Sequence, residues 1–524
     1  MSSTHIAKSR SSEDFGVYCP GSFVVGALLF ILVLLNRSTT QINLKKMNKS
    51  IFSGLAALSV FTACQTAPEK EKQTPKPNIV YILADDLGYG DLSCYGQQKF
   101  QTPHLDRLAS QGMLFTQHYA GTTVCAPSRS SLMTGLDTGH TPIRGNKGWE
   151  PEGQWPLPAE SFTVPEMLKE AGYVTGAFGK WGLGFIGTEG DPNKQGIDEF
   201  YGYNCQSLAH NYYPGHLWHN QEKIELEGNV EDQFETYAPT LIHEQALRFI
   251  EDNKDTSFFL FYPNVIPHAE LLIPEEYMAE FRNKFLPERV YDGAKPGDSR
   301  FREGSYGYQE ESHAAFAAMV TLLDQQVGDV MAKLAELGLE DNTLVIFTSD
   351  NGPHLEGGAD PDFFNSNGPL KGYKRDLYEG GIRVPMIARW PANIVAGSVS
   401  DHVSAFWDVM PTFAEIVDAE KPQNIQGISF LPALLGEEGQ EQHDQLYWEF
   451  HEQGGRQAIR KGNWKFVTYQ VFNPEKQTEE LYDLSVDLGE ENNLASEHPE
   501  VVEEMKALLS EARIPSEPFP FGDQ

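Results

Sequence analysis

The strongest constraint on the fold is a set of short apolar runs, each of which ends abruptly in polar residues. Residues 78–84 read Asn-Ile-Val-Tyr-Ile-Leu-Ala and are followed at once by Asp85 and Asp86. Such a near-continuous β-branched run predicts a strand buried on both faces of a parallel sheet. Similar runs lie at residues 173–178, 257–262, 343–349 and 384–390. Open α/β sheets bind ligands at the carboxyl ends of their strands, so we expect an α/β protein with its site there.

The polar residues at two of these strand ends predict a cation site. Asp85 and Asp86 are adjacent carboxylates, which repel each other unless a cation is present. Asp350 and Asn351 place two more side-chain oxygens after the run 343–349. Oxygen ligands indicate calcium or magnesium rather than zinc. A solvated turn would explain one such Asp, but it explains an adjacent pair poorly.

Helix signals alternate with the strands. Thr102-Pro103 begins a helix that ends at Gly112, and Thr163-x-x-Glu166 caps one that ends at Gly172. Longer helices are predicted near 238–252 and 312–337, where apolar residues recur with helical spacing. The order predicts strands and helices that alternate along one large domain.

Residues 187–235 lack helical periodicity and are rich in Gly, Asn, Tyr, Trp and His. We therefore expect a long functional loop region here. Its aromatic residues Tyr212, Tyr213 and Trp218 have two open interpretations: they stack on a sugar face, or they pack the loop. A single histidine, His268, follows the strand run 257–262 and obeys the same strand-end rule.

Cys125 lies in the segment Cys-Ala-Pro-Ser-Arg. Pro127 suits the first turn of a helix that ends at Gly135, so Cys125 is expected just before the helix N-terminus. Unpaired backbone N–H groups and the positive end of the helix dipole would then face a ligand bound there. The residues alone leave three roles open for this thiol: nucleophile, metal ligand or small buried hydrophobe.

The composition and the net charge limit the classes of partner that the chain can bind. With 524 residues and 40% hydrophobic content, the chain can bury a large core. A formal charge of −34 argues against nucleic acid or an anionic membrane surface as a partner, so an anionic substrate needs a local cationic site. The five cysteines form no paired framework.

The N-terminal region is expected to be a leader. After Met47, the apolar run 51–61 precedes Thr-Ala-Cys64, which resembles a bacterial lipoprotein signal with a lipidated cysteine. We expect Met47 to be the true start and the mature protein to be exported to the periplasm or outer membrane of a Gram-negative bacterium, held to a membrane only by the lipid. The alternative is that a second apolar run, residues 21–35, is an uncleaved anchor.

The predicted organisation has four parts. These are a leader (1–64), a flexible tether (65–77), a catalytic domain (78–439) and a C-terminal subdomain (440–524). In the last part, residues 446–450, 456–469 and 481–482 alternate like antiparallel strands, and a final helix is expected at about 498–512.

Several motifs resemble the sulfatase family of the alkaline phosphatase superfamily. These are Cys125-x-Pro-Ser-Arg, Gly179-Lys180-Trp181, and Lys371-x-x-Lys374 followed by Tyr-Glu-Gly-Gly-Ile-Arg-Val-Pro at 378–385. The resemblance covers roughly residues 76–515. It implies an alkaline-phosphatase-like α/β/α sandwich with a smaller C-terminal antiparallel-sheet subdomain, and it implies a sulfuric ester hydrolase.

In that family the cysteine is oxidised to formylglycine, whose hydrate attacks sulfur. The resemblance therefore implies one calcium ion with five ligands: Asp85, Asp86, Asp350, Asn351 and the modified Cys125. It further implies that Arg129 helps to hold the hydrate and that Lys180 and Lys374 offset charge on the sulfate oxygens. His268 would protonate the departing alcohol.

One position departs from the family, which usually has Gly-Lys-Trp-His-Leu-Gly where this chain has Gly182 in place of the histidine. The family histidine contacts the hydrate, so another group is expected to take its place. His210 is our first candidate and His354 the second; the alternative is that both only form local hydrogen bonds.

Maturation and substrate are also implied. The partner would be a formylglycine-generating enzyme or an anaerobic sulfatase-maturing enzyme, although Met-Thr-Gly-Leu136 replaces the usual Leu-Thr-Gly-Arg. We expect a sulfated carbohydrate substrate with terminal sulfated galactose or N-acetylgalactosamine.

Three alternatives remain open. The first is an arylsulfatase of small esters. The second is a phosphatase or phosphodiesterase of the superfamily, whose pair of zinc-binding Asp-x-x-x-His motifs is not seen. The third is a glycan-binding lipoprotein that has lost its activity, which an intact Cys125 segment argues against.

Overall fold

The computed structural model describes residues 76–150, 152–230, 233–302 and 305–522, which all belong to one compact unit, Thr74–Gln524. The predicted leader, the start at Met47 and nearly all of the tether lie outside these residues. None of the described helices combines the length and the hydropathy that a bilayer crossing requires.

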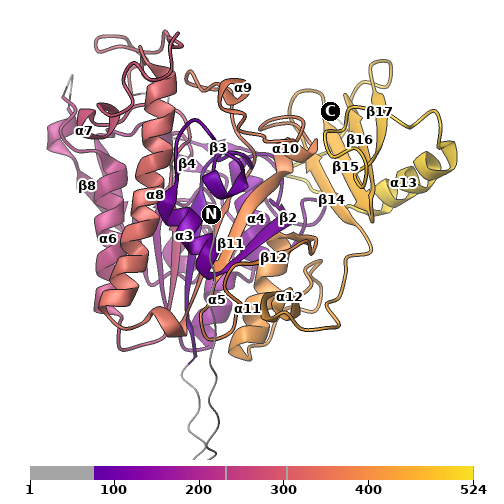
Figure 1. Ribbon diagram of the computed structural model, residues 1–524, viewed down its shortest axis with the longest axis horizontal. Helices are drawn as coiled ribbons and strands as arrows, with labels where there is room; N and C mark the ends of the chain where they lie inside the picture. The colour runs from indigo at the N-terminus through magenta and orange to yellow at the C-terminus, as the bar shows by residue number, and fades with distance from the viewer. Residues whose placement is uncertain (1–75, 151, 231–232, 303–304, 523–524) are drawn as a thin grey trace, which may run out of the picture. The chain divides into compact units, whose positions relative to one another are not determined.

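An eleven-stranded mixed sheet forms the centre of the fold (Figure 1). Its middle is parallel and consists of β10 (Thr343–Ser349), β1 (Asn78–Ala84), β9 (Phe258–Pro263), β5 (Val174–Lys180) and β6 (Glu199–Tyr203). Antiparallel β11 (Arg383–Arg389) pairs with β10 and carries β2 (Met113–Tyr119), β12 (Ser398–Ser400) and β13 (Ser404–Ala405) at one side. The other side ends in β7 (His216–His219) and β8 (Glu222–Glu225).

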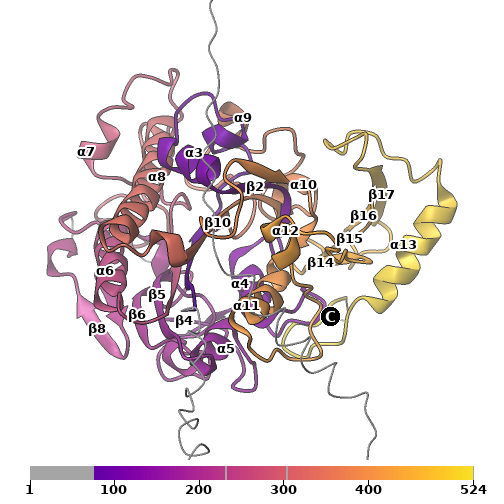
Figure 2. The ribbon, with the colours of Figure 1, turned by 60° about the horizontal axis from the view of Figure 1, so that its bottom comes forward.

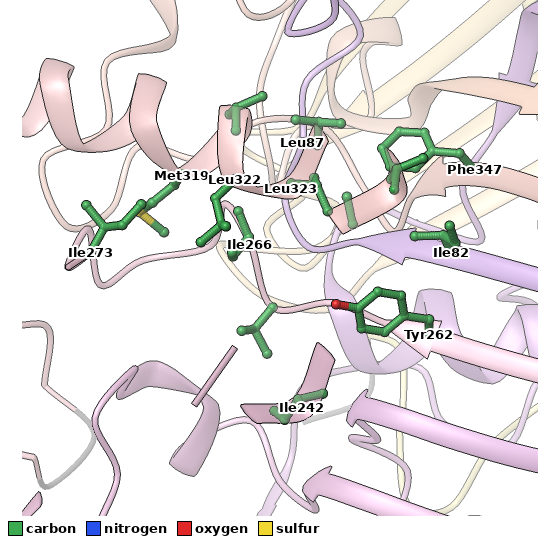
Figure 3. Packing of buried hydrophobic residues seen from close by; sticks show 14 of the residues in the cluster. Ile82, Leu87, Ile242, Tyr262, Ile266, Ile273, Met319, Leu322, Leu323 and Phe347 are labelled. Atoms are coloured by element: carbon green, nitrogen blue, oxygen red, sulfur yellow. The ribbon is translucent and has the colours of Figure 1, made fainter. Parts of the chain in front are cut away.

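Helices cover both faces of this sheet (Figures 1 and 2). One face is covered by α3 (Pro103–Gln111), α6 (Ala238–Asp252) and α8 (Ser312–Glu336), and the other by α4 (Cys125–Thr134), α5 (Val164–Glu170) and α11 (Val409–Val417). Alternate residues of β1 enter the two cores. Ile82 packs with Leu323 and Phe347 in the first (Figure 3), whereas Tyr81 packs in the second. The fully apolar run is therefore buried on both sides, and the predicted α/β/α sandwich is confirmed.

The C-terminal subdomain is also present as predicted. A four-stranded antiparallel sheet contains β14 (Leu446–Phe450), β15 (Arg456–Lys461), β16 (Trp464–Tyr469) and β17 (Thr478–Asp483). Helix α13 (Pro499–Glu511) packs on it through Val502, Met505 and Leu509 (Figure 2). The domain bounds given above stay a prediction.

Buried charges join this sheet to the catalytic domain. Lys465 on β16 lies 2.9 Å from Glu379 Oε1 and 3.0 Å from Glu490 Oε1, and all three side chains are fully buried. Glu379 begins α10 (Glu379–Ile382), and its other oxygen accepts a 2.6 Å hydrogen bond from Tyr119. The subdomain thereby braces the segment that follows Lys374.

Three features differ from the sequence predictions. Residues 187–235 contain β6, β7 and β8, which extend the sheet, instead of only a loop. Cys125 is the first residue of α4 and does not precede it. Strand β2 was not predicted. The remaining short elements are β3 (Gly148–Trp149), β4 (Gly153–Gln154), α7 (Glu275–Met278), α9 (Pro361–Phe364) and α12 (Leu431–Leu435).

Candidate active site

The carboxyl ends of the parallel strands meet at one edge of the sheet and carry the predicted site residues. Asp85 follows β1, Asp350 follows β10, Lys180 ends β5 and His268 follows β9. Because β1 pairs with both β9 and β10, and β9 pairs with β5, these four strand ends are neighbours. These residues are far apart in the sequence, and they lie together because they follow the carboxyl ends of neighbouring strands, where open α/β sheets bind ligands.

Cys125 occupies the N-terminus of α4 beneath this edge. The residue is 1% exposed, and its Sγ lies 3.3 Å from Asp85 Oδ1. The helix start is fixed by the backbone N–H of Ala126, which donates to Asn146 Oδ1 at 3.1 Å, and its end by Gly135 at a φ of 71°. Burial, and then Asp85, raises the pKa of the thiol, so Cys125 is a neutral thiol rather than a thiolate.

Arg129 contacts residues at three of the strand ends that form the site. Its Nη2 lies 2.8 Å from Asp350 Oδ2 and 3.3 Å from Asp85 Oδ2, and its Nη1 donates to the Lys180 carbonyl oxygen. One fully buried guanidinium therefore ties together the ends of β1, β5 and β10. The neighbouring Ser128 hydroxyl donates to the Asp350 carbonyl at 2.6 Å, so the Pro-Ser-Arg part of the motif fixes α4 against β10.

Two lysines pair with the two adjacent aspartates. Lys180 Nζ lies 2.6 Å from Asp85 Oδ2, and Lys374 Nζ lies 2.8 Å from Asp86 Oδ2. Burial favours the neutral form of all four groups, but the opposite charges outweigh it. The pKa of each lysine is therefore raised and the pKa of each aspartate lowered. Both ammonium groups and both carboxylates are charged.

The donor set fits a hard divalent cation. Asp86 N donates to Asp350 Oδ1 at 3.1 Å, and Asn351 Nδ2 donates to Asp86 Oδ1 at 2.7 Å, so the oxygens of the predicted ligands converge. Among the described residues, the buried Asn351 Oδ1 has no hydrogen-bond partner. Ligand atoms of four buried side chains lie within 4.8 Å of one another: Asp85, Asp86, Cys125 and His268.

The charge on Asp350 supports the same fit. Burial, followed by the repulsion from Asp85, raises its pKa to about 6, even though Arg129 lies beside it. Three carboxylates therefore meet where the available cations do not fully offset their charge. A bound cation with oxygen ligands would relieve this repulsion, and the residues present fit calcium.

His268 lies at the centre of a stack of three histidines. Its ring centroid is 5.3 Å from that of His210 and 5.7 Å from that of His354, with interplanar angles of 11° and 19°. His268 Nδ1 bonds to the Ala269 carbonyl, and its Nε2 lies 3.4 Å from Asp86 Oδ2. Burial, and then the positive charge of Lys374, lowers the pKa of His268 well below the usual value, so without substrate the neutral ring is the favoured form at neutral pH.

The space left open at Gly182 is occupied by the side chain of a residue that the sequence analysis did not identify. The structure places His210 against His268 and Tyr306, whereas Gln206 lies over Gly182. A methyl group at Gly182 would be 2.8 Å from Gln206 Nε2. No motif marked Gln206; the only usable signal was its position just after β6, which the sequence did not show as a strand.

The aromatic residues of this region have structural contacts. Tyr212 is fully buried, and its hydroxyl lies 2.8 Å from the carbonyl oxygens of both Val265 and His268, which share its one proton. Tyr213 is 7% exposed and packs on Tyr237. Of the two interpretations left open, these two tyrosines fit the one in which they pack the loop, and Tyr212 holds the His268 turn in place.

These observations define a class of protein, and comparison with known proteins agrees. A fold with helices on both faces of the sheet brings buried acids, two lysines, an arginine and a Cys-x-Pro-Ser-Arg helix start together at its strand ends. The sequence model of the sulfatase family matches residues 77–419, and that of the N-sulphoglucosamine sulphohydrolase C-terminal region matches residues 372–514. The chain belongs to the sulfatase family and is a sulfuric ester hydrolase, as the motifs implied.

Particular relatives are similar over most of their length. An N-acetylgalactosamine-6-O-sulfatase of Bacteroides thetaiotaomicron is 30% identical over 88% of this chain and 98% of the relative. Human arylsulfatase A is 33% identical over 82% of this chain and 87% of the relative. The crystal structure of Ps i-CgsB matches with a TM-score of 0.69 and 28% identity, over 86% of this chain and 95% of that one, and Ps i-CgsB has also been solved in complex with k-i-k-neocarrahexaose.

Proposed function

We propose that this enzyme removes sulfate from a carbohydrate, with 6-O-sulfated N-acetylgalactosamine as the first expected substrate and sulfated galactose as the second. The observation that carries the sugar assignment is the similarity to an N-acetylgalactosamine-6-O-sulfatase, which extends over 98% of that relative. The carbohydrate complex of Ps i-CgsB supports the broader class.

We infer that Cys125 is converted to formylglycine, whose hydrate supplies an oxygen nucleophile. The fit is favourable because the side chain lies at a helix N-terminus within 3.3 Å of Asp85. A calcium ion held by Asp85, Asp86, Asp350 and Asn351 would supply positive charge beside the sulfate. This local charge is needed because the chain as a whole carries a formal charge of −34.

The chain's own residues have distinct tasks in this proposal. Arg129 holds the ends of three strands and keeps the acids in register. Lys180 and Lys374, both buried and charged, offset the negative charge of the sulfate oxygens. His268, which follows β9 and whose Nε2 lies 3.4 Å from Asp86 Oδ2, takes up a proton in the substrate complex and gives it to the departing alcohol.

A second candidate function is hydrolysis of small aryl sulfates, which the 33% identity to human arylsulfatase A favours. The two-zinc phosphatase alternative has less support. Asp350 and His354 have the spacing of one Asp-x-x-x-His motif, but His354 Nε2 lies 3.1 Å from the Pro267 carbonyl oxygen and its Nδ1 3.2 Å from the Glu356 backbone nitrogen. Both nitrogens of this ring therefore have protein partners.

The test is a panel of four substrates given to protein that was produced together with a maturing enzyme. They are N-acetylgalactosamine 6-sulfate, galactose 6-sulfate, p-nitrophenyl sulfate and p-nitrophenyl phosphate. We expect the highest kcat/KM for N-acetylgalactosamine 6-sulfate. Preference for the aryl sulfate would favour the second candidate, and preference for the phosphate would refute the proposal.

The same proposal places the enzyme outside the cytoplasm. We propose an exported lipoprotein, anchored through Cys64 in the periplasm or outer membrane of a Gram-negative bacterium, where it would meet extracellular glycans. Its maturing partner would be a formylglycine-generating or an anaerobic sulfatase-maturing enzyme. The lipoprotein signal after Met47 supports the location.

A further inference from the structure

Gln206 presents an unused hydrogen-bond donor beside the site. Among the described residues its Nε2 has no hydrogen-bond partner, although the atom is buried. A buried amide N–H without a partner is costly, and such groups in native proteins call for an explanation. Gln206 has no place in the roles assigned above, so its amide is available for a ligand.

The position of this amide is set by the sheet. Lys180, at the end of β5, pairs with Tyr203 at the end of β6, so Gln206 lies three residues beyond the same edge. Its backbone N–H donates to Gln154 Oε1 at 3.3 Å, and the preceding Cys205 is fully buried. The backbone at Gln206 is therefore fixed by the Gln154 side chain and by the buried residue that precedes it.

Gly182 makes room for the amide. This residue has a φ of 73°, and a methyl group there would lie 2.8 Å from Gln206 Nε2 and 3.9 Å from Arg129 Cδ. The contact with Nε2 is shorter than real carbon–nitrogen contacts allow. Glycine at 182, two residues beyond Lys180, thus lets the amide lie close to the Arg129 side chain.

The chemistry of the surroundings identifies the ligand atom. Arg129 and Lys180 have only donors, so neither can accept from the Gln206 amide. Asp85, the carboxylate that pairs with Lys180, already accepts hydrogen bonds from Lys180 and Arg129. A buried, unpaired amide donor just beyond the sheet edge that carries Lys180 is suited to an oxygen of the anion that this lysine is proposed to bind.

We propose that Gln206 Nε2 donates a hydrogen bond to an oxygen of the sulfuryl group of the bound substrate and thereby positions that group beside Lys180. This inference rests on the proposed function, because it takes the anion to be a sulfate ester. An amide does not titrate, so Gln206 is a positioning donor and neither an acid nor a base.

Binding to a protein that cannot turn over provides the direct test. In a Cys125→Ala background, calorimetry would compare N-acetylgalactosamine 6-sulfate with the sugar that lacks the sulfate. We expect Gln206→Ala to weaken binding of the sulfated sugar about tenfold or more, with no change for the unsulfated sugar. Gln206→Glu keeps the shape but has no donor, so its loss should be at least as large.

The matched control is Gln221→Ala. Gln221 lies in the same stretch of chain, but its amide is already bonded to Asp191 and Asn193. The affinity of the Gln221→Ala protein for the sulfated sugar should stay within about twofold of that of the Cys125→Ala protein. A structural role for Gln206 would instead lower the affinity for both sugars together.

A second pair of variants tests the contact itself. Gly182→Ala carries the strain of a positive φ in any background, but its clash with the amide disappears when Gln206 is also replaced by Ala. The affinity loss caused by Gly182→Ala should therefore be smaller in the Gln206→Ala background.

Two outcomes distinguish a failure of the Gln206 inference from a failure of the proposed function. Unchanged affinity and unchanged kcat in Gln206→Ala would overturn the inference and leave the proposed function intact. Absence of turnover of every sulfated sugar by the mature, unsubstituted protein would refute the proposed function, while a sulfate-specific loss of binding would still support the role of Gln206.

Discussion

Replacement of Lys465 by Met tests how firmly the C-terminal subdomain is joined to the catalytic domain. The ammonium group is fully buried between Glu379 and Glu490, at 2.9 and 3.0 Å. Met fills a similar volume but leaves the carboxylates without their shared cation. Removing one partner of a buried ion pair costs about 3–5 kcal/mol. Glu379 keeps Arg383 at 3.2 Å, so most of the loss should fall on Glu490.

The loss of stability caused by Lys465→Met should increase as the pH rises. Burial raises the pKa of Glu490 to about 7, so the folded protein holds its proton more tightly than the unfolded chain does. The stability contributed by this group is present at low pH and is lost as the pH rises through about 7. Without Lys465 the pKa rises further, at about 1.4 kcal/mol per unit. The destabilisation should therefore be larger at pH 8 than at pH 5.5.

Urea unfolding at the two pH values would measure both effects. The matched control is Lys461→Met on the same β-hairpin. Lys461 is 47% exposed and pairs with Glu504, so its loss should stay below about 1 kcal/mol at either pH. Equal free energies of unfolding for the Lys465→Met and Lys461→Met proteins would refute the reasoning.

Three further results are expected. Cys125→Ala should abolish turnover with little change in the thermal midpoint, because one small buried side chain replaces another; retained activity would exclude the formylglycine proposal. EGTA should inactivate the enzyme and calcium should restore it, whereas restoration by zinc alone would favour the phosphatase alternative. Tyr212→Phe removes the buried hydroxyl whose proton is shared between the Val265 and His268 carbonyl oxygens, and it should cost about 1–3 kcal/mol in urea unfolding and lower kcat more than it raises KM; an unchanged kcat would exclude a role for Tyr212 in holding His268.

A fourth experiment concerns the compartment. Expressed from Met47 in a bacterial host, the protein should be acylated at Cys64 and sediment with membranes. Cys64→Ala should release it into the soluble fraction, as immunoblots of fractionated cells would show. The same substitution is then made in the chain expressed from Met1, which contains the run 21–35. If that protein stays bound to membranes while the one expressed from Met47 is soluble, the run 21–35 is an anchor and the start at Met47 is wrong.

The strands that could be predicted from the sequence are those whose residues are all buried. The strands 78–84 and 343–349 have the predicted bounds because each is buried on both faces and therefore apolar throughout. Strand β2 could not be found because Thr116 and Gln117, at its centre, are only partly buried and break the apolar run. Helix α11 is buried on nearly all sides, so it lacks the polar face that marks a surface helix.

The site divides in the same way. Asp85 and Asp350 could be identified because they follow strands that the sequence shows clearly, and the rule that ligands bind at strand ends brings them together. Gln206 could not, because β6 contains Gly202 and has no clear apolar run. The stack of His210 on His268 depends on the path of the chain between β6 and β9, which no local pattern encodes.

The burial of Cys125 bears on when its proposed conversion to formylglycine would take place. Its side chain is 1% exposed and lies beneath the ends of β1 and β10, which are separated from it by 40 and more than 200 residues of sequence. In the folded protein the Cys125 sulfur atom therefore has little surface that a maturing enzyme could contact. Under the proposed maturation, oxidation of Cys125 before β1 and β10 pair would give the active form, and a chain that folds first would keep the thiol.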